Sequence, residues 1–176
     1  LDPLNPTSFR FYLVALLHTG REDEVRRIIA SGKAPWFAGS YHRLEHALAV
    51  MEADELVGVL FIDIDRFKVF NDSLGHGVGD KILVRLAKRL EQRMSKGATV
   101  GCLGGDEFAI VVEGGKSSEA IAGFAQEAID AWNQPFILDG RSYFITASIG
   151  ISIAPADGSD ALTLLKHADI AMYRAK

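Results

Sequence analysis

The sequence predicts an α+β domain in which helices flank a mixed, largely antiparallel central sheet. Residues 56–64 form a mostly apolar run rich in branched side chains and bounded by charges, which is typical of a strand buried on both faces. Two short apolar segments flank Gly104-Gly105, which is a hairpin signal. The other predicted strands are separated by helical segments, so they need helical crossovers.

Composition and charge exclude several classes of protein. The chain has 176 residues, of which 48% are hydrophobic and 24% charged, as in a soluble globular protein and unlike a disordered one. The longest apolar runs, residues 11–17 and 56–62, are far shorter than the about 20 residues needed to cross a bilayer. A net charge of -4 argues against binding nucleic acid or an anionic membrane surface.

The single cysteine indicates the compartment. Cys102 cannot form an internal disulfide, and no signal peptide is visible, so we expect a cytoplasmic location and a small core-filling role for Cys102. The chain begins at Leu1, and its last helical pattern runs to Lys176. We therefore expect a fragment of a longer protein, which could carry a membrane anchor elsewhere.

The N-terminal part of the chain is expected to be helical. Apolar residues recur at helical spacing over residues 1–31, with a break at residues 18–20. The turn-rich joint at residues 31–35 suggests a boundary. We therefore expect a helical extension or connector over residues 1–33 and the main domain over residues 34–176.

The main domain is expected to open with a helix carrying Leu44, Leu48 and Met51 on one side. Periodicity and turn residues then predict the remaining elements in order. These are a strand over 56–64, a helix over 65–74, a flexible turn over 75–79, a helix over 80–94, strands over 99–103 and 108–112, a helix over 119–132, a strand over 141–153 after the Asp139-Gly140 turn, and a helix over 160–176.

Two acidic pairs stand where strands end. Asp63 and Asp65 lie two residues apart on an extended chain, so both carboxylates are expected to face the same side. Asp106-Glu107 follow paired glycines that can adopt positive φ and bring backbone N–H groups close to a phosphate. Such a cluster of hard oxygen ligands favours Mg²⁺ or Mn²⁺. The alternative is that these acids are solvated and that Asp65 caps the next helix.

Other polar residues fit a nucleotide. Asn71 and Asp80 together offer the donor and acceptors that could bind the edge of a guanine, with His76 between them. Lys68 and Lys176 are candidates for phosphate contacts. Each also has an ordinary explanation as a helix-end, turn or solvated surface residue.

The motif Gly104-Gly105-Asp106-Glu107-Phe108 is the signature of the GGDEF family of diguanylate cyclases, and the chain resembles this family well beyond it. The resemblance covers roughly residues 39–176. It includes the blocks at residues 61–68, 71–72, 75–76, 79–80, 146–151 and 168–176.

This resemblance implies a fold similar to nucleotidyl cyclases and polymerase palms, and the condensation of two GTP into cyclic di-GMP with release of two pyrophosphates. Two subunits, each holding one GTP, are implied to face each other. The implied catalytic residues are Asp63, Asp106 and Glu107, with Asp106 linked to activation of the ribose 3′-hydroxyl. The implied ligands of one or two Mg²⁺ ions are Asp63, the Ile64 carbonyl, Asp106 and Glu107. The implied substrate-binding residues are Asn71 and Asp80 for guanine, and Phe67, Lys68, Gly104, Gly105 and Lys176 around the phosphates.

The chain departs from the family pattern in three places, one of which is that the family's last helix continues past Ala175-Lys176 with further basic residues. Of the early family block, aligned with residues 35–43, only Gly39 and Arg43 are retained. This leaves an alternative open: a catalytically weak or inactive GTP-binding module that regulates an adjacent cyclic di-GMP phosphodiesterase (EAL) domain. A sensor domain is expected upstream in either case. The family's inhibitory product site is replaced by Ser95 and Ala98, which implies no feedback by product there.

Overall fold

The computed structural model describes Leu16 and residues 19–176, and only the backbone of residues 35–37. The predicted helix over residues 1–31 therefore lies mostly outside the described residues. No helix among those described is long and apolar enough to span a membrane.

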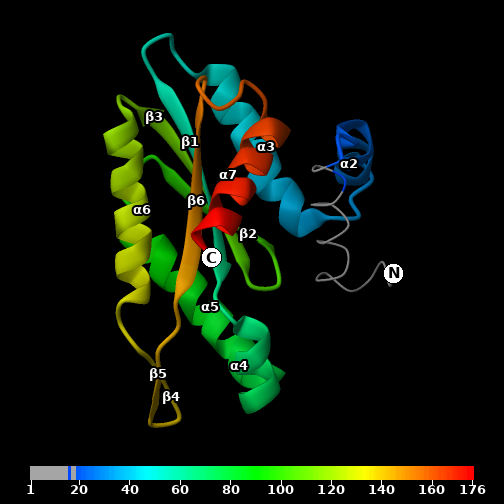
Figure 1. Ribbon diagram of the computed structural model, residues 1–176. Helices are drawn as coiled ribbons and strands as arrows, with labels where there is room; N and C mark the ends of the chain where they lie inside the picture. Colours follow the sequence, from blue (N-terminus) through cyan, green and yellow to red (C-terminus); the bar gives the residue numbers. More distant parts are fainter. Residues whose placement is uncertain (1–15, 17–18) are drawn as a thin grey trace.

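The elements, shown in Figure 1, are α2 (Glu22–Ala30), α3 (Pro35–Val50), β1 (Leu56–Ile64), α4 (Phe67–Leu74), α5 (His76–Arg93), β2 (Ala98–Gly104), β3 (Glu107–Gly115), α6 (Ser118–Trp132), β4 (Phe136–Leu138), β5 (Arg141–Tyr143), β6 (Ala147–Ala154) and α7 (Ala161–Ala175).

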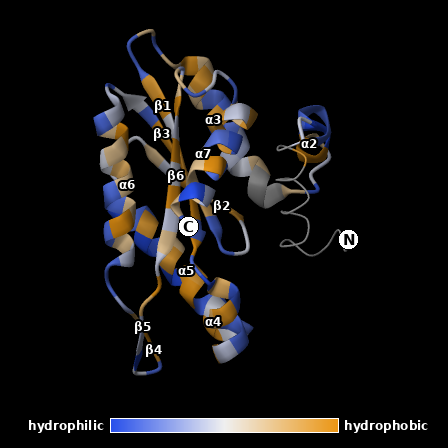
Figure 2. Ribbon diagram, in the orientation of Figure 1, coloured by the Kyte–Doolittle hydropathy of each residue, from blue (hydrophilic) through white to orange (hydrophobic). Residues whose placement is uncertain are grey.

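The main sheet has the strand order β2-β3-β1-β6, and each neighbouring pair is antiparallel. The predicted strand over 56–64 is β1, which is buried almost along its whole length because it lies inside the sheet between two helical layers. Figure 2 shows β1 as one of the most hydrophobic segments of the chain. The predicted α+β fold is confirmed, and the four strands are antiparallel throughout.

The two faces of the sheet carry separate cores. Helices α3 and α7 cover one face, while α5 and α6 cover the other (Figure 1). On β1 the side chains alternate between them: Val57, Val59 and Phe61 pack on the α3 and α7 side, and Leu60 and Ile62 pack on the α5 and α6 side. This alternation decides on which side the acids at the strand end project.

Helix α7 lies unusually close to β6. A Cβ placed on Gly150 would lie 2.1 Å from both the Ala168 carbonyl oxygen and the Met172 amide nitrogen. Two residues along the strand, the buried Ser152 hydroxyl donates a hydrogen bond to the Leu164 carbonyl at 2.7 Å. Small residues of β6 therefore set the position of α7 and of Lys176, which directly follows it.

A polar cluster attaches the N-terminal helix α2 to the main domain. Arg26 of α2 donates to the buried Tyr41 hydroxyl of α3 at 2.6 Å and lies 3.9 Å from Asp160, the N-cap of α7. The Tyr41 hydroxyl in turn donates to Glu45. Burial, reinforced by the Glu45 carboxylate, raises the pKa of Tyr41 to about 12, so this hydroxyl remains a donor at physiological pH.

Two predicted elements are wrong. The flexible turn over 75–79 is the first part of α5, because only Gly75 has a positive φ there (86°) and the helix begins at His76. The single strand over 141–153 is broken at residues 144–146. Its first part, β5, pairs instead with the unpredicted strand β4, which precedes it.

The prediction that Cys102 fills the core is also wrong. The residue is exposed, although its strand was placed correctly. Strand β2 is at the edge of the sheet, and only its last two residues, Leu103 and Gly104, are buried. An apolar sequence at a sheet edge is therefore not evidence of burial.

Candidate functional site

The ends of β1 and β3 bring two acids together. Asp63 is the register partner of Glu107, so the two side chains lie on the same face of the sheet. Both continue the alternation that places Phe61 of β1 and Ala109 of β3 on the α7 side. Asp63 is 7% exposed and Glu107 is 5% exposed. Two carboxylates from distant parts of the chain thus share a largely buried position.

The Gly-Gly hairpin lies against the end of β1. Gly104 and Gly105 have φ values of 118° and 61°, as the paired glycines predicted. The tip is held in place by a hydrogen bond of 3.2 Å from the Ile64 amide to the Asp106 carbonyl oxygen. This contact places the half-buried Asp106 beside the strand that carries Asp63.

A lysine completes this arrangement. The Lys176 ammonium donates to Asp63 Oδ1 at 2.6 Å. The lysine comes from the end of α7, which the close packing on Gly150 positions over this face of the sheet. The acids are therefore matched with a cation supplied from the C-terminal end of the chain.

Asp65 takes part in a different set of contacts. Its carboxylate accepts hydrogen bonds from the Thr146 hydroxyl at 2.7 Å and the Ser148 hydroxyl at 2.8 Å. It does not cap α4, whose N-cap is Arg66 in the left-handed conformation with φ 54°. The suggestion that Asp65 is a helix cap is therefore wrong. No local signal identifies the two hydroxyls, because they lie more than 80 residues further along the chain.

The predicted guanine-binding residues lie where α4 meets α5. A Cβ on Gly79 would lie 1.9 Å from Asn71 Oδ1, so this glycine makes room for the Asn71 amide. The Asn71 Oδ1 atom is buried and accepts no hydrogen bond within the described part of the structure. Asp80, on the next residue of α5, is exposed. A buried acceptor beside an exposed carboxylate suits a ligand edge that presents N–H donors.

The other predicted residues around the site differ in their environments. Phe67 is 6% exposed and stacks on Phe70 with ring centroids 5.9 Å apart, so it packs α4 in place. Lys68 and His76 are exposed. Within the described part of the chain, no contact joins either of these two side chains to Asp63 or Glu107.

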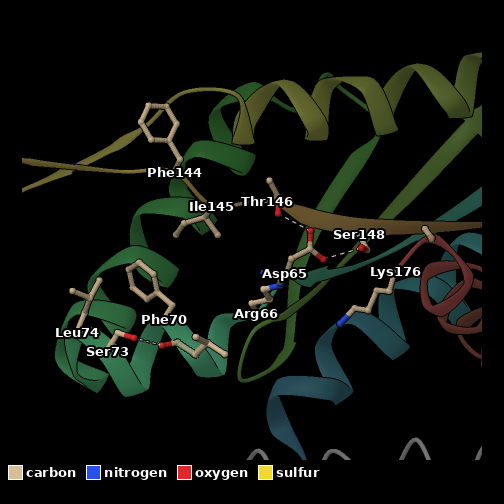
Figure 3. A pocket seen from close by; sticks show the side chains of 12 residues that line it. Asp65, Arg66, Phe70, Ser73, Leu74, Phe144, Ile145, Thr146, Ser148 and Lys176 are labelled. Atoms are coloured by element: carbon tan, nitrogen blue, oxygen red, sulfur yellow. Dashed lines mark hydrogen bonds between the residues drawn. The ribbon is translucent and has the colours of Figure 1, made fainter.

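An open cleft of about 880 Å³ adjoins the site on the β6 side. It is lined by α4, the connection from β5 to β6, and Lys176, and Figure 3 shows the aromatic rings of Phe70 and Phe144 on its walls. Of the predicted substrate-binding residues, Lys176 alone lines this cleft. The cleft was not predicted. Its wall residue Phe144, 77% exposed, lies in the connection that interrupts the predicted strand.

The donor set fits a hard divalent cation. Asp63 and Glu107 supply carboxylates from neighbouring strands, Asp106 follows at the hairpin, and a cationic nitrogen already contacts Asp63. Oxygen donors of this kind suit Mg²⁺ or Mn²⁺. Within the described residues, no group of three His, Cys, Asp or Glu side chains is placed to hold a metal, so these acids supply two paired carboxylates, of Asp63 and Glu107, rather than a complete set of ligands.

Comparisons with known proteins identify the family of this chain. A family model, diguanylate cyclase GGDEF domain, matches residues 39–176. The signalling protein YkoW of Bacillus subtilis is 36% identical over 160 residues, which are 88% of this chain and 20% of YkoW. The bifunctional diguanylate cyclase/cyclic di-GMP phosphodiesterase MucR of Pseudomonas aeruginosa is 38% identical over 135 residues, 76% of this chain and 20% of MucR.

Solved structures give the same result. The crystal structure of the GGDEF domain of TpbB (YfiN) from Pseudomonas aeruginosa has a TM-score of 0.75 and 38% identity, covering 78% of this chain and 87% of that one. The chain spans about a fifth of the length of YkoW and of MucR. On the match over residues 39–176 and these likenesses, the chain belongs to the GGDEF family, the family of diguanylate cyclase domains.

Proposed function

We propose that this chain is an active diguanylate cyclase domain, which condenses two GTP into cyclic di-GMP and two pyrophosphates, depends on Mg²⁺ and works as a dimer. The observation that carries the proposal is the pairing of Asp63 with Glu107 at the end of the sheet, next to the Gly-Gly hairpin. Membership of the family supports it.

In this proposal the acids have two roles, metal binding and proton transfer. Asp63, the Ile64 carbonyl, Asp106 and Glu107 would hold the metal, and Asp106 accepts the proton of the ribose 3′-hydroxyl. Bound Mg²⁺ supplies a charge that offsets the α-phosphate and lowers the pKa of the attacking hydroxyl. The hydrogen bond between the hairpin and Ile64 keeps Asp106 in position.

The remaining residues orient the nucleotide. Asn71 and Asp80 accept hydrogen bonds from the guanine edge, which an adenine cannot supply in the same pattern. The positive-φ glycines let the hairpin backbone approach the phosphates, and Lys176 and Lys68 contribute positive charge. Phe67 supports this arrangement by packing, since it is buried against Phe70.

The wider architecture is also part of the proposal. Residues 34–176 form the GGDEF domain, and residues 1–33 connect it to an upstream sensor. Because MucR is named as both a cyclase and a phosphodiesterase, an EAL domain downstream is consistent with the likeness. We propose a cytoplasmic location for this domain, since it uses GTP.

The direct test is incubation of the protein with GTP and Mg²⁺ at high protein concentration, with the product identified by mass. We expect cyclic di-GMP from GTP and no cyclic dinucleotide from ATP, since Asn71 and Asp80 match guanine. Replacing Asp80 with Ala should lower kcat/KM for GTP by about 10- to 100-fold, as one or two hydrogen bonds to a charged group are lost. An unchanged kcat/KM would exclude Asp80 from guanine recognition.

A second function remains a candidate because the early family block is altered in this chain. Residues 35–43 lack most of the early family block, and His42 Nδ1 lies 3.5 Å from Glu45 Oε2 there. In this alternative the domain binds GTP and regulates an adjacent EAL domain without turnover. GTP binding measured by calorimetry, together with no product in the mass assay, would favour it.

Product feedback provides a further prediction. At Ser95, the amide and hydroxyl both donate to the Glu127 carboxylate, at 2.8 Å and 2.7 Å. A carboxylate at this position disfavours a phosphate ligand, because like charges repel. We expect added cyclic di-GMP to leave the initial rate unchanged within about twofold. Strong inhibition by cyclic di-GMP would contradict this prediction if the inhibition changed in the variants Glu127→Arg or Ser95→Glu.

A further inference from the structure

The contact between Lys176 and Asp63 has a role that the phosphate-binding assignment does not cover. We propose that the Lys176 ammonium is a resident counter-ion for the acidic pair, that the divalent metal must displace it from Asp63, and that it thereby keeps the nucleotide-free site from binding metal tightly. The proposal rests on the proposed metal site and adds a positioning role for Lys176 before nucleotide arrives.

Electrostatics gives the reason for such a residue. Asp63 and Glu107 face each other across two strands, and like charges in directly opposite positions destabilise a sheet. The Asp63 side chain is only 10% exposed, so water screens this repulsion poorly. An ammonium 2.6 Å from Asp63 Oδ1 offsets it in the absence of metal.

The position of Lys176 allows the ammonium to be released. Its side chain is 37% exposed, in contrast to that of Asp63, and it follows the last residue of α7. The close approach of Gly150 to Met172 fixes the helix, while the flexible lysine stem allows the head group to move. The same residue lines the cleft beside the site, and Figure 3 shows its side chain extending from the end of α7. An anionic ligand entering from this side can therefore draw the ammonium away from Asp63.

This exchange makes metal and nucleotide binding mutually favourable. Phosphates that attract the ammonium leave Asp63 available, and a metal on Asp63 leaves the ammonium available for phosphates. Since coupling between two ligands is reciprocal, each should raise the affinity for the other. Removing the charge of Lys176 should remove part of this coupling. It should also have opposite effects on the affinities for metal and for nucleotide when each is measured alone.

The test measures binding in the absence of turnover. Mn²⁺ is titrated into the nucleotide-free protein and followed by electron paramagnetic resonance, for wild type and Lys176→Met. We expect Lys176→Met to bind Mn²⁺ at least about 5-fold more tightly, which is the lower end of usual coupling effects. The same variant should bind GTP at least about 5-fold more weakly in the presence of EDTA.

Two matched variants separate this role from others. Lys166→Met removes the same charge from the same helix but at a residue without a described contact to the acids, and should leave both affinities within about twofold. Lys176→Arg keeps the charge and should resemble wild type in Mn²⁺ affinity. Circular dichroism and thermal unfolding confirm that the folds match.

The outcomes distinguish failure of the counter-ion role from failure of the proposed function. Unchanged or weaker Mn²⁺ binding by Lys176→Met, with wild type still binding Mn²⁺ in an Asp63-dependent way, overturns the counter-ion role and leaves the proposed function intact. No Mn²⁺ binding by any variant, with or without GTP, overturns both. Tighter Mn²⁺ binding by Lys166→Met to the same extent would show a general charge effect and overturn the specific role of Lys176.

Discussion

Replacing Asp106 with asparagine should lower the turnover of GTP by about 10²- to 10⁴-fold, the usual effect of losing a general base. The substitution keeps the size of the side chain and leaves the main chain as it is, including the hydrogen bond from the Ile64 amide to the residue's carbonyl oxygen. It removes one negative charge and the group proposed to accept the 3′-hydroxyl proton. The measurement is kcat for cyclic di-GMP formation at saturating GTP and Mg²⁺.

The structure offers a matched control for this substitution. Asp139 is also an aspartate in a hairpin turn, but at the separate β4–β5 hairpin and 85% exposed in its side chain. Its positive φ of 50° suits asparagine equally well, so Asp139→Asn should leave kcat and stability nearly unchanged. An Asp106→Asn enzyme that keeps kcat within a few-fold of wild type would remove Asp106 from the proton transfer.

The parts of the fold that were predicted correctly are those with strong local patterns. The continuous apolar run over residues 56–64 became β1 with the predicted bounds, because only burial on both faces accommodates such a run. The Gly104-Gly105 hairpin was predicted because two positive φ angles in succession favour glycine. The pairing of Asp63 with Glu107 followed from placing acids at the ends of strands, although no local pattern gives the register that makes them neighbours.

The elements that were not predicted depend on contacts between distant segments or on a short turn signal. Asp139 and Gly140 both have positive φ, as in a two-residue hairpin turn, so the Phe136–Leu138 segment before them could have been assigned as β4. The sequence predicts Gly79 in a turn, but it lies inside α5, where the Asn71 side chain of α4 occupies the space that a Cβ would need. Composition alone does not distinguish a flexible glycine from one required for close packing.

The candidate site also depends on a helix far from the signature motif. Lys176 reaches Asp63 only because α7 packs directly on β6, and this packing is set by Gly150 and by the hydrogen bond from Ser152 to Leu164. At its other end, α7 begins at Asp160, whose carboxylate accepts from the amides of Leu162 and Thr163 and lies near Arg26 of α2. A change in the packing of α7 should therefore affect both stability and the acidic pair.

Replacing Gly150 with alanine should lower the free energy of unfolding by about 3 kcal/mol, at the upper end of usual overpacking effects. The added Cβ would lie 2.1 Å from the Ala168 carbonyl oxygen and the Met172 amide nitrogen, which are backbone atoms that cannot rotate away. Helix α7 must move outward, which also shifts Lys176 relative to Asp63. Thermal unfolding should show a midpoint about 6–12 °C lower than wild type, given the size of the domain.

A second glycine separates this steric effect from the general effect of alanine. Gly123 lies inside α6, and a Cβ added there would meet no atom within 4 Å, so Gly123→Ala should raise stability by about 0.5–1 kcal/mol through the better helix propensity of alanine. Opposite shifts in the two variants follow from the packing of α7 on β6. If the thermal unfolding midpoint of Gly150→Ala lay within about 2 °C of wild type, α7 would be able to accept the added methyl group at this contact. The position of Lys176 over the acids would then be set by something other than Gly150.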